Sequence, residues 1–218
     1  MVDKKQAPQD TFDVLQWNMI HAHDVFKAGC DSILRHLDNP PRDDLANFLG
    51  YCLAWAESII EHHDAEEKIV FPFLNTKLDF SGEIEQHKAV HAPLKAMVAM
   101  IHEAQADLTK FDPQQFKELV VPLRVPLFNH LDDEVSHIGA DSLKVFDEPA
   151  LRKMCTDMDS YSKSHGDPFM IVPFMRSHTP PEFKDHWPVM PWVLRKLVVP
   201  ILALRHSGYW KFSPYAVS

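Results

Sequence analysis

The sequence predicts an all-α protein: an antiparallel up-down-up-down four-helix bundle followed by a C-terminal helical extension. Four consecutive segments carry apolar residues at alternating spacings of three and four, which is the pattern of bundle helices. The chain has only 6 glycines among 218 residues, which disfavours a sheet protein full of tight turns. Its 45% hydrophobic and 24% charged residues are ordinary for a soluble globular chain, so a substantial core is available.

The first two helices are predicted on either side of a proline-rich break at residues 39–41. The first spans Thr11–Leu37, and its inward stripe consists of Met19, His23, Phe26, Cys30, Ile33 and Leu37. The inward stripe of the second consists of Leu45, Phe48, Cys52, Trp55, Ile59, His62, Glu66, Ile69 and Phe73. We expect the second helix to bend near Pro72, with a loose segment up to Gly82, because a proline ring removes a helical hydrogen bond.

The third and fourth helices follow short connections, so neighbouring helices should be antiparallel. Ser81-Gly82 precedes the third stripe, which consists of Ile84, His87, His91, Leu94, Val98, Ile101 and Leu108. Asp112 is the expected N-cap of the fourth helix, with Pro113 at the first helical position. The fourth stripe consists of Phe116, Leu119, Leu123, Leu127, His130, Glu134 and His137. Since each helical residue rises about 1.5 Å, His91 and His130 should lie at one level.

We assign residues 11–147 to the bundle and residues 148–218 to an extension packed on it. Residues 151–164 are predicted as a fifth helix, residues 167–187 as irregular, and residues 191–206 as a helix kinked at Pro200. Residues 190–218 carry four basic side chains, five aromatic ones and no acid. The apolar side of the last helix is expected to dock on the acidic bundle; it consists of Val193, Leu194, Leu197, Val198, Ile201 and Leu202. The alternative is peripheral contact of this basic aromatic segment with a membrane surface.

Charge and composition disfavour several classes of function. The formal net charge of -9 opposes nucleic-acid binding. No run of about 18 apolar residues is present, so no helix should span a membrane. The first ten residues lack the apolar stretch of a signal peptide, and the three cysteines form no C-x-x-C pair. We therefore expect a reducing, cytoplasmic location.

Apart from His137, seven polar residues interrupt the apolar stripes, and they carry the candidate chemistry. They are His23, His62, Glu66, His87, His91, His130 and Glu134. Three helices each contribute a pair spaced i, i+4, which places both side chains on one face. Burying these imidazoles and carboxylates without partners would cost several kcal/mol for each charged group. A metal centre removes that cost, because both groups are natural metal ligands.

The ligand set indicates two metal ions. Two six-coordinate ions have about twelve ligand positions, and the five imidazoles, two bridging carboxylates and one bridging oxygen leave about one open. An open position on a redox-active pair of ions is what O2 binding requires. Zinc prefers about four ligands, and calcium and magnesium prefer all-oxygen shells. Two iron ions are therefore the favoured cofactor, with manganese as the alternative.

At these residues the sequence resembles the hemerythrin-like family of HHE cation-binding domain proteins. The segment HHDAEEKIVFPFL is similar to that family's HxxxEE motif and the apolar-Phe-Pro element after it. The remaining matches are His87 and His91 in EQHKAVH, His130 and Glu134 in HLDDE, and His23 as the lone histidine of the first helix. The resemblance covers about residues 11–146, and the later segment RHSGYWKFSP resembles the tail of fungal members.

The resemblance implies a four-helix bundle around a non-haem di-iron centre, with the seven residues as ligands and Glu66 and Glu134 bridging the ions. The fourth helix departs from the family's oxygen carriers, because it has HxxxE where they have HxxxxD. The HxxxE form also occurs in relatives that sense iron. Three functions stay open: a protein that binds or senses O2, a di-iron oxidase or oxygenase acting on a small organic substrate, and an iron-sensing or iron-binding module.

Four further polar residues lie on or near the stripes. His63 and Glu67 sit one residue, or about 100° around the helix, away from the inward stripe. They are interpreted as surface groups or as groups that hydrogen-bond to the metal ligands. His21 lies about 200° from His23 and is expected on the surface. His137 lies one turn beyond the last His/Glu pair and is a candidate for an extra ligand or a proton donor.

Overall fold

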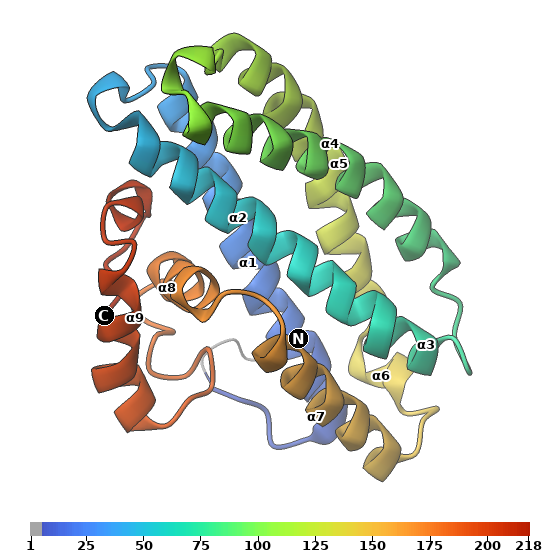
Figure 1. Ribbon diagram of the computed structural model, residues 1–218. Helices are drawn as coiled ribbons and strands as arrows, with labels where there is room; N and C mark the ends of the chain where they lie inside the picture. Colours follow the sequence, from blue (N-terminus) through green and yellow to red (C-terminus); the bar gives the residue numbers. More distant parts are fainter. Residues whose placement is uncertain (1–5) are drawn as a thin grey trace.

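All regular structure in residues 6–218, the part of the chain that the computed structural model describes, is helical (Figure 1). The predicted all-α class is confirmed. The four longest helices are α1 (Thr11–Leu37), α2 (Leu45–Ala65), α4 (Ser81–Ala106) and α5 (Pro113–His137). α4 contacts both α2 and α5, and α1 also contacts both. None of the helices in residues 6–218 has the length and apolar character needed to cross a bilayer.

Local sequence signals explain where the helices begin. Asp10 caps α1, because its side chain accepts a hydrogen bond from the backbone N–H of Phe12. Asp112 caps α5 by accepting from the backbone N–H groups of the two residues after Pro113. Pro113 occupies the first turn, where its missing N–H removes no helical hydrogen bond. The predicted start of the fourth helix is therefore confirmed.

The end of α2 contains an irregular turn. α2 continues into a π-helical turn, η2 (Glu66–Val70), and then into α3 (Phe71–Leu74). The Phe71 N–H donates to the carbonyl of Glu66, five residues back, so an extra residue is taken up just before Pro72. Prolines and π turns are the usual causes of an irregular helix, and here the two coincide at the predicted bend.

The extra residue changes which side chains face inward after η2. Val70 and Leu74 are buried, whereas the predicted inward residues Ile69 and Phe73 are only half-buried. The loose segment expected up to Gly82 is found at residues 75–80, and it ends two residues earlier than expected because α4 begins at Ser81. Periodicity could not foresee the extra residue, since it assumes a uniform 3.6 residues per turn.

The space between the four long helices is filled by two apolar clusters of side chains, and a layer of polar side chains separates the clusters. Met19 of α1 belongs to one cluster and Phe26 to the other. Ile59 of α2 and Val70 of η2 are divided in the same way. The polar residues of the predicted stripes lie between these positions along each helix. They therefore come together at one level of the molecule, as the helical rise per residue predicts.

Residues 140–218 form shorter helices beside the long ones (Figure 1). They are α6 (Ala140–Leu143), α7 (Glu148–Ser164), α8 (Pro168–His178), η4 (Leu194–Val198), α9 (Val199–Leu204) and η5 (Tyr209–Phe212). The prediction of irregular chain over residues 167–187 is wrong for α8. Asp167 accepts from the Phe169 N–H and Pro168 occupies the first turn, so α8 begins with the same signal as α5.

Buried hydrogen bonds attach these shorter helices to α1 and α2. The Tyr51 hydroxyl of α2 lies 2.7 Å from Nε2 of His178 in α8. The Ser32 hydroxyl of α1 donates to the carbonyl of Phe212 in η5 at 2.5 Å. Both pairs are buried, so each satisfies polar atoms that would otherwise lose their contact with water.

Residues 192–204, which include η4 and α9, are called the last helical segment. The apolar side of this segment faces outward, which contradicts the predicted docking face. Within α9 only Val199 and Ala203 are buried. Five of the six predicted docking residues are exposed, and Leu202 is half-buried. α8 lies between α9 and the long helices (Figure 1). The helix that the sequence analysis missed therefore occupies the surface that the last helix was expected to cover.

The predicted surface position of His21 is also wrong, because its side chain is buried. Its ring packs edge-on against Trp17 and Phe183, at centroid distances of 4.8 and 5.1 Å, and stacks on Trp187 at 5.4 Å. Phe183 and Trp187 come from the segment after α8. A distant part of the chain thus covers this face of α1, and helical periodicity carries no information about such cover.

Candidate metal centre

Polar side chains from all four long helices meet in the layer between the two apolar clusters. The contributors are His23 from α1, His62 and His63 from α2, Glu66 from η2, His87 from α4, and His130 and Glu134 from α5. All are buried except His62, which is half-buried. Six of the seven predicted ligands are in this group. His91 lies at its edge, and His63 is an addition.

The first half of the layer is built on α1 and α2. His23, His62 and Glu66 offer ligand atoms that lie within 4.8 Å of one another. Nε2 of His62 is 2.8 Å from Oε1 of Glu66 and 3.2 Å from Nε2 of His23. Nε2 of His23 is 3.5 Å from Oε2 of Glu134. Two neutral imidazole nitrogens at such a distance share one proton or face the same cation, so this geometry suits a metal ion.

The second half is built on α2, α4 and α5. His63, His87 and His130 also offer ligand atoms within 4.8 Å of one another. Their ring centroids are 4.0 Å apart for His63 and His87, 5.0 Å for His63 and His130, and 4.6 Å for His87 and His130. Nε2 of His87 lies 3.5 Å from Oε2 of Glu66. One oxygen of Glu66 therefore faces each half of the layer.

Seven nitrogen and oxygen atoms of this layer, all within residues 6–218, are buried without a hydrogen-bond partner. They are Nε2 of His63, His87 and His130, and both carboxylate oxygens of Glu66 and Glu134. His62 approaches Glu66 closely but without the alignment of a hydrogen bond. Each unpaired buried polar atom costs about 1–3 kcal/mol. Imidazole nitrogens and carboxylate oxygens in this arrangement fit a transition metal such as iron.

The outer ring nitrogens of three layer histidines have hydrogen-bond acceptors. The pairs are His23 Nδ1 with the Leu131 carbonyl at 2.8 Å, His87 Nδ1 with Glu67 Oε1 at 3.0 Å, and His130 Nδ1 with Gln86 Oε1 at 3.2 Å. An imidazole that donates from Nδ1 presents a lone pair at Nε2, which is the form that binds a metal. The surroundings of the layer thus favour the tautomer that a metal site needs.

Burial shifts the protonation of every group in the layer. It lowers the pKa of His62 and of His130 to about 4 and that of His87 to about 2. It raises the pKa of Glu66 and of Glu134, and the Glu66 carboxyl beside Glu134 raises the latter further. The imidazoles are therefore neutral near pH 7, and each carboxyl would release a proton when a cation binds to it.

His91 is half-buried beside the layer. A step of 3.6 residues from His87 lands between Val90 and His91, and Val90 is the one that is buried. Nε2 of His91 lies 3.1 Å from Nδ1 of His63, which is the outer nitrogen of that ring. His91, His87 and Glu67 form a further group of candidate ligand atoms, but Glu67 is exposed and contacts the outer nitrogen of His87.

His137 makes other contacts. Its Nδ1 lies 2.7 Å from Oε1 of Glu83, and its ring stacks on Phe80 at a centroid distance of 4.3 Å. The three groups of candidate metal ligands found in residues 6–218 do not include it. The hypothesis of His137 as an extra ligand thus gains no support from the geometry.

His63 is the layer residue that the sequence analysis left out. A step of 3.6 residues from Ile59 lands between His62 and His63, so the centre line of the inward stripe passes between the two rings. Both histidines reach the layer, one on each side of this line. The sequence contained a signal for this arrangement, because His63 and Glu67 form a second i, i+4 pair directly after the first.

The π-helical turn begins at the central carboxylate of the layer. Such turns occur mostly at functional sites, because they accommodate a residue that a regular helix would direct elsewhere. Here the extra residue follows Glu66. Glu66 can therefore point into the polar layer while Val70 still packs in the neighbouring apolar cluster.

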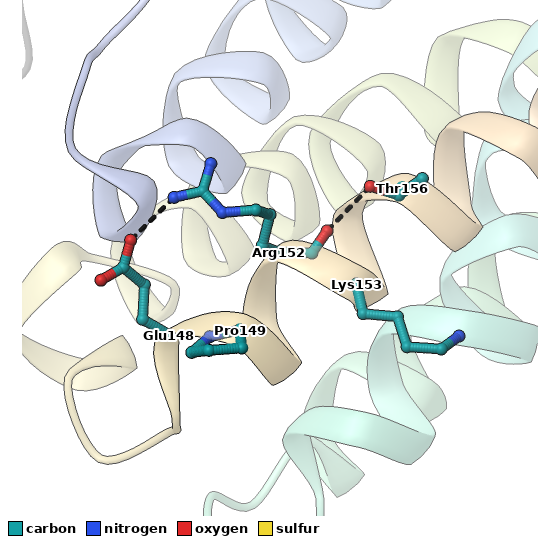
Figure 2. A pocket seen from close by; sticks show the side chains of 5 residues that line it. All are labelled: Glu148, Pro149, Arg152, Lys153 and Thr156. Atoms are coloured by element: carbon teal, nitrogen blue, oxygen red, sulfur yellow. Dashed lines mark hydrogen bonds and ion pairs between the residues drawn. The ribbon is translucent and has the colours of Figure 1, made fainter.

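A surface pocket on α7 (Figure 2) shares no residue with this layer. It is lined by Glu148, Pro149, Arg152, Lys153 and Thr156. The Arg152 guanidinium lies 2.7 Å from the Glu148 carboxylate, and the Thr156 hydroxyl donates to the Arg152 carbonyl at 3.0 Å. Lys153 pairs with Asp157 one turn later. The charged groups of the pocket thus each have an ion-pair partner, and the pocket contains none of the predicted site residues.

Comparisons with known proteins place the layer inside a recognised domain. The sequence profile described as "Hemerythrin HHE cation binding domain" matches residues 15–140, which confirms the resemblance seen in the motifs. The chain is also 27% identical over 211 residues to the "Dimeric xanthone biosynthesis cluster protein R11" of Cryptosporiopsis sp. (strain 8999). That alignment covers 92% of this chain and 78% of the relative. No solved structure matches the chain.

Proposed function

The chain belongs to the hemerythrin HHE cation-binding family, and we propose that its polar layer holds a non-haem di-iron centre that binds or reacts with O2. Membership of the family supports cation binding. The mixture of imidazole and carboxylate donors supports iron over calcium or magnesium, which prefer oxygen alone. The number of donors supports iron over zinc, which prefers about four ligands. Manganese is the alternative ion.

The observation that carries this proposal is the convergence of seven unpartnered buried atoms on one layer within residues 6–218. Glu66 belongs to the first group of ligand atoms, and its Oε2 also lies 3.5 Å from Nε2 of His87 in the second group. That is the arrangement expected for two ions joined by a carboxylate. We take the four long helices to form an antiparallel bundle, because short connections join consecutive helices.

The residues have distinct roles in the proposed centre. The seven ligands assigned from the sequence are His23, His62, Glu66, His87, His91, His130 and Glu134, with Glu66 and Glu134 bridging the ions. We divide the histidines by position, with His23 and His62 for one ion and His87, His91 and His130 for the other. Bound iron supplies the electrons for reaction with O2. The chain itself orients the rings through their Nδ1 contacts, and the apolar clusters on either side exclude bulk water.

A di-iron oxidase or oxygenase acting on a small organic substrate is the second candidate. The relative named for a xanthone biosynthesis cluster favours it, because the similarity extends over 92% of this chain and so includes part of the C-terminal extension. An extension that is shared with a biosynthetic protein suits a role in admitting a substrate. An iron-sensing or iron-binding module is the third candidate, and it predicts that the fold is lost when iron is withheld.

Exposure of anaerobic, reduced, iron-loaded protein to O2 tests these roles. A change in visible absorption that reverses when O2 is removed supports O2 binding. Rapid irreversible oxidation of the iron supports an oxidase or oxygenase. Iron that stays ferrous in air would reject any reaction with O2, and loss of the helical circular dichroism signal on iron removal would favour the third role. The zinc-loaded chain is the control, because zinc has no redox chemistry.

We further propose that the last helical segment contacts an anionic lipid surface through its exposed apolar side. Leu197, Ile201 and Leu204 are 54%, 63% and 71% exposed. Trp192 is exposed at the start of the segment, and aromatic rings of this kind prefer the membrane interface. Residues 190–218 carry four basic residues and no acid. Arg195 and Lys211 pair with Asp185 and Asp44, so Lys196 and Arg205 are the two that supply positive charge to this proposal. Apolar and basic groups together are typical of helices that lie on anionic membranes.

Vesicle flotation tests this second proposal. Full-length protein should float with vesicles that contain phosphatidylserine and less with vesicles of phosphatidylcholine alone. The double variant Leu197→Asp, Ile201→Asp should stay unbound. The double variant Val121→Asp, Val125→Asp is the matched control, because it places the same two charges, also four residues apart, at exposed apolar residues of α5. Protein that does not float but forms dimers in sedimentation would overturn the lipid proposal and assign this side to a second copy of the chain.

A further inference from the structure

We propose that His63, rather than His91, is the third imidazole ligand of the second ion. This inference rests on the proposed di-iron centre and changes the ligand set that the HxxxH motif implies. The choice matters because the two histidines come from different helices. His63 would tie the second ion to α2, whereas His91 would tie it to α4.

Burial and geometry favour His63. Its side chain is fully buried, and its Nε2 atom has no hydrogen-bond partner. Its candidate ligand atom lies within 4.8 Å of those of His87 and His130. Among the three groups of candidate ligands found in residues 6–218, this is the one whose members are all buried. A buried histidine whose unpaired nitrogen lies close to two other imidazoles is in the position expected of a metal ligand.

His91 contacts the opposite side of the His63 ring. Its Nε2 lies 3.1 Å from Nδ1 of His63. A ring that binds a metal through Nε2 carries its proton on Nδ1, and that N–H needs an acceptor. His91 supplies one, just as Glu67 does for His87. We therefore assign His91 as a positioning residue that holds His63 in its orientation and tautomer.

The assignment gives α2 and η2 three of the proposed ligands within a little more than one turn. His62 belongs to the first group of ligand atoms, His63 to the second, and Glu66 faces both. Adjacent residues on a helix point about 100° apart, so neighbouring histidines can serve two ions on either side of one carboxylate. Both ions would then depend on the segment that contains the π-helical turn.

Anaerobic iron titration of full-length variants tests the inference. His63→Ala should bind about one iron per chain in place of about two, and its Mössbauer spectrum should lose one of two iron components. His91→Ala should still bind about two, with the second held about 10–100-fold more weakly. His91→Gln should restore that affinity, because an amide oxygen can accept from Nδ1 as Gln86 does for His130.

The opposite pattern, one iron in His91→Ala and two in His63→Ala, would assign the ligand to His91 and overturn the inference. Equal iron content in the two alanine variants would overturn it as well. Circular dichroism shows whether each variant folds. If His63→Ala does not fold, the titration is repeated with His63→Gln, whose side chain is closer in size to histidine. A wild-type chain that binds no iron would instead reject the di-iron proposal itself, so the two failures are distinguishable.

Discussion

The polar layer and the last helical segment depart from the usual distribution of side chains in opposite ways. Inside the long helices, nitrogen and oxygen atoms are buried without partners. On the outer side of η4 and α9, large apolar side chains are exposed to water. Both departures cost free energy: about 1–3 kcal/mol for each unpaired buried polar atom, and about 25 cal/mol for each Å² of apolar surface left exposed.

The difference between the two regions lies in what could remove the cost. The polar atoms converge from four helices into two compact groups, so they suit small cations. The apolar side chains are spread along one helical segment, so they suit an extended surface. The layer is enclosed by the long helices, whereas the segment is attached through α8. Changes in one region should therefore leave binding at the other unaffected, and the predictions below test that separation.

The largest effect is expected for Glu66→Ala. This carboxylate faces both groups of ligand atoms, so its loss removes a ligand from each ion. We expect iron to fall from about two ions per chain to about one or fewer, measured by elemental analysis of the purified variant. His21→Ala is the control, because that buried ring packs among aromatic side chains outside the layer and should not affect iron. Equal iron content in the two variants would show that the polar layer is not the binding site.

Glu134→Leu should separate stability from metal binding. Both carboxylate oxygens of Glu134 are buried without partners, and leucine is similar in size. In the metal-free state we expect the variant to have a free energy of unfolding about 1–3 kcal/mol above that of wild type, measured with urea. In the presence of iron we expect weaker binding. A metal-free variant that is less stable than wild type would contradict the view that this carboxyl lacks partners in the fold.

Gly50→Ala should loosen the attachment of the C-terminal extension without affecting the layer. A Cβ atom at Gly50 would collide with the ring of Tyr209. We expect the free energy of unfolding to fall by about 1–3 kcal/mol, with iron content unchanged. Gly82→Ala is the matched control, because a Cβ there meets nothing within 4 Å. Thermal unfolding that is equally affected in both variants would argue against the tight contact between α2 and η5.

A smaller effect is expected from pH at the contact between α2 and α8. Burial lowers the pKa of His178 from 6.5 to about 3. Between these values the unfolded chain binds a proton that the folded chain does not, so falling pH favours unfolding. As pH falls from about 6.5 to about 5, wild type should lose stability faster than His178→Gln, which has no such proton to bind. Identical slopes of unfolding free energy against pH would remove His178 as a source of acid sensitivity.

Periodicity predicted the long helices well but could not resolve the layer to single residues. It placed α1 over Thr11–Leu37, with the bounds found in the structure, because local signals define both ends. It also placed Glu66, His87 and Glu134 on inward faces, where the structure has them. It failed where a step of 3.6 residues lands between two positions. His63 is the residue that this ambiguity concealed.

Contacts between distant parts of the chain explain the remaining errors. His21 is covered by aromatic residues from the segment after α8, more than 150 positions later. The apolar side of α9 faces outward because α8 takes the surface beside α1 and α2. A pattern within one helix indicates which side is apolar. It does not indicate which of several later segments will cover that side.

Metal analysis of the full-length protein, purified without chelators, tests the central claim most directly. We expect about two transition-metal ions per chain, most of them iron, because two groups of ligand atoms share one buried carboxylate. Fewer than about half an equivalent of any transition metal, in protein that also fails to take up iron anaerobically, would contradict it.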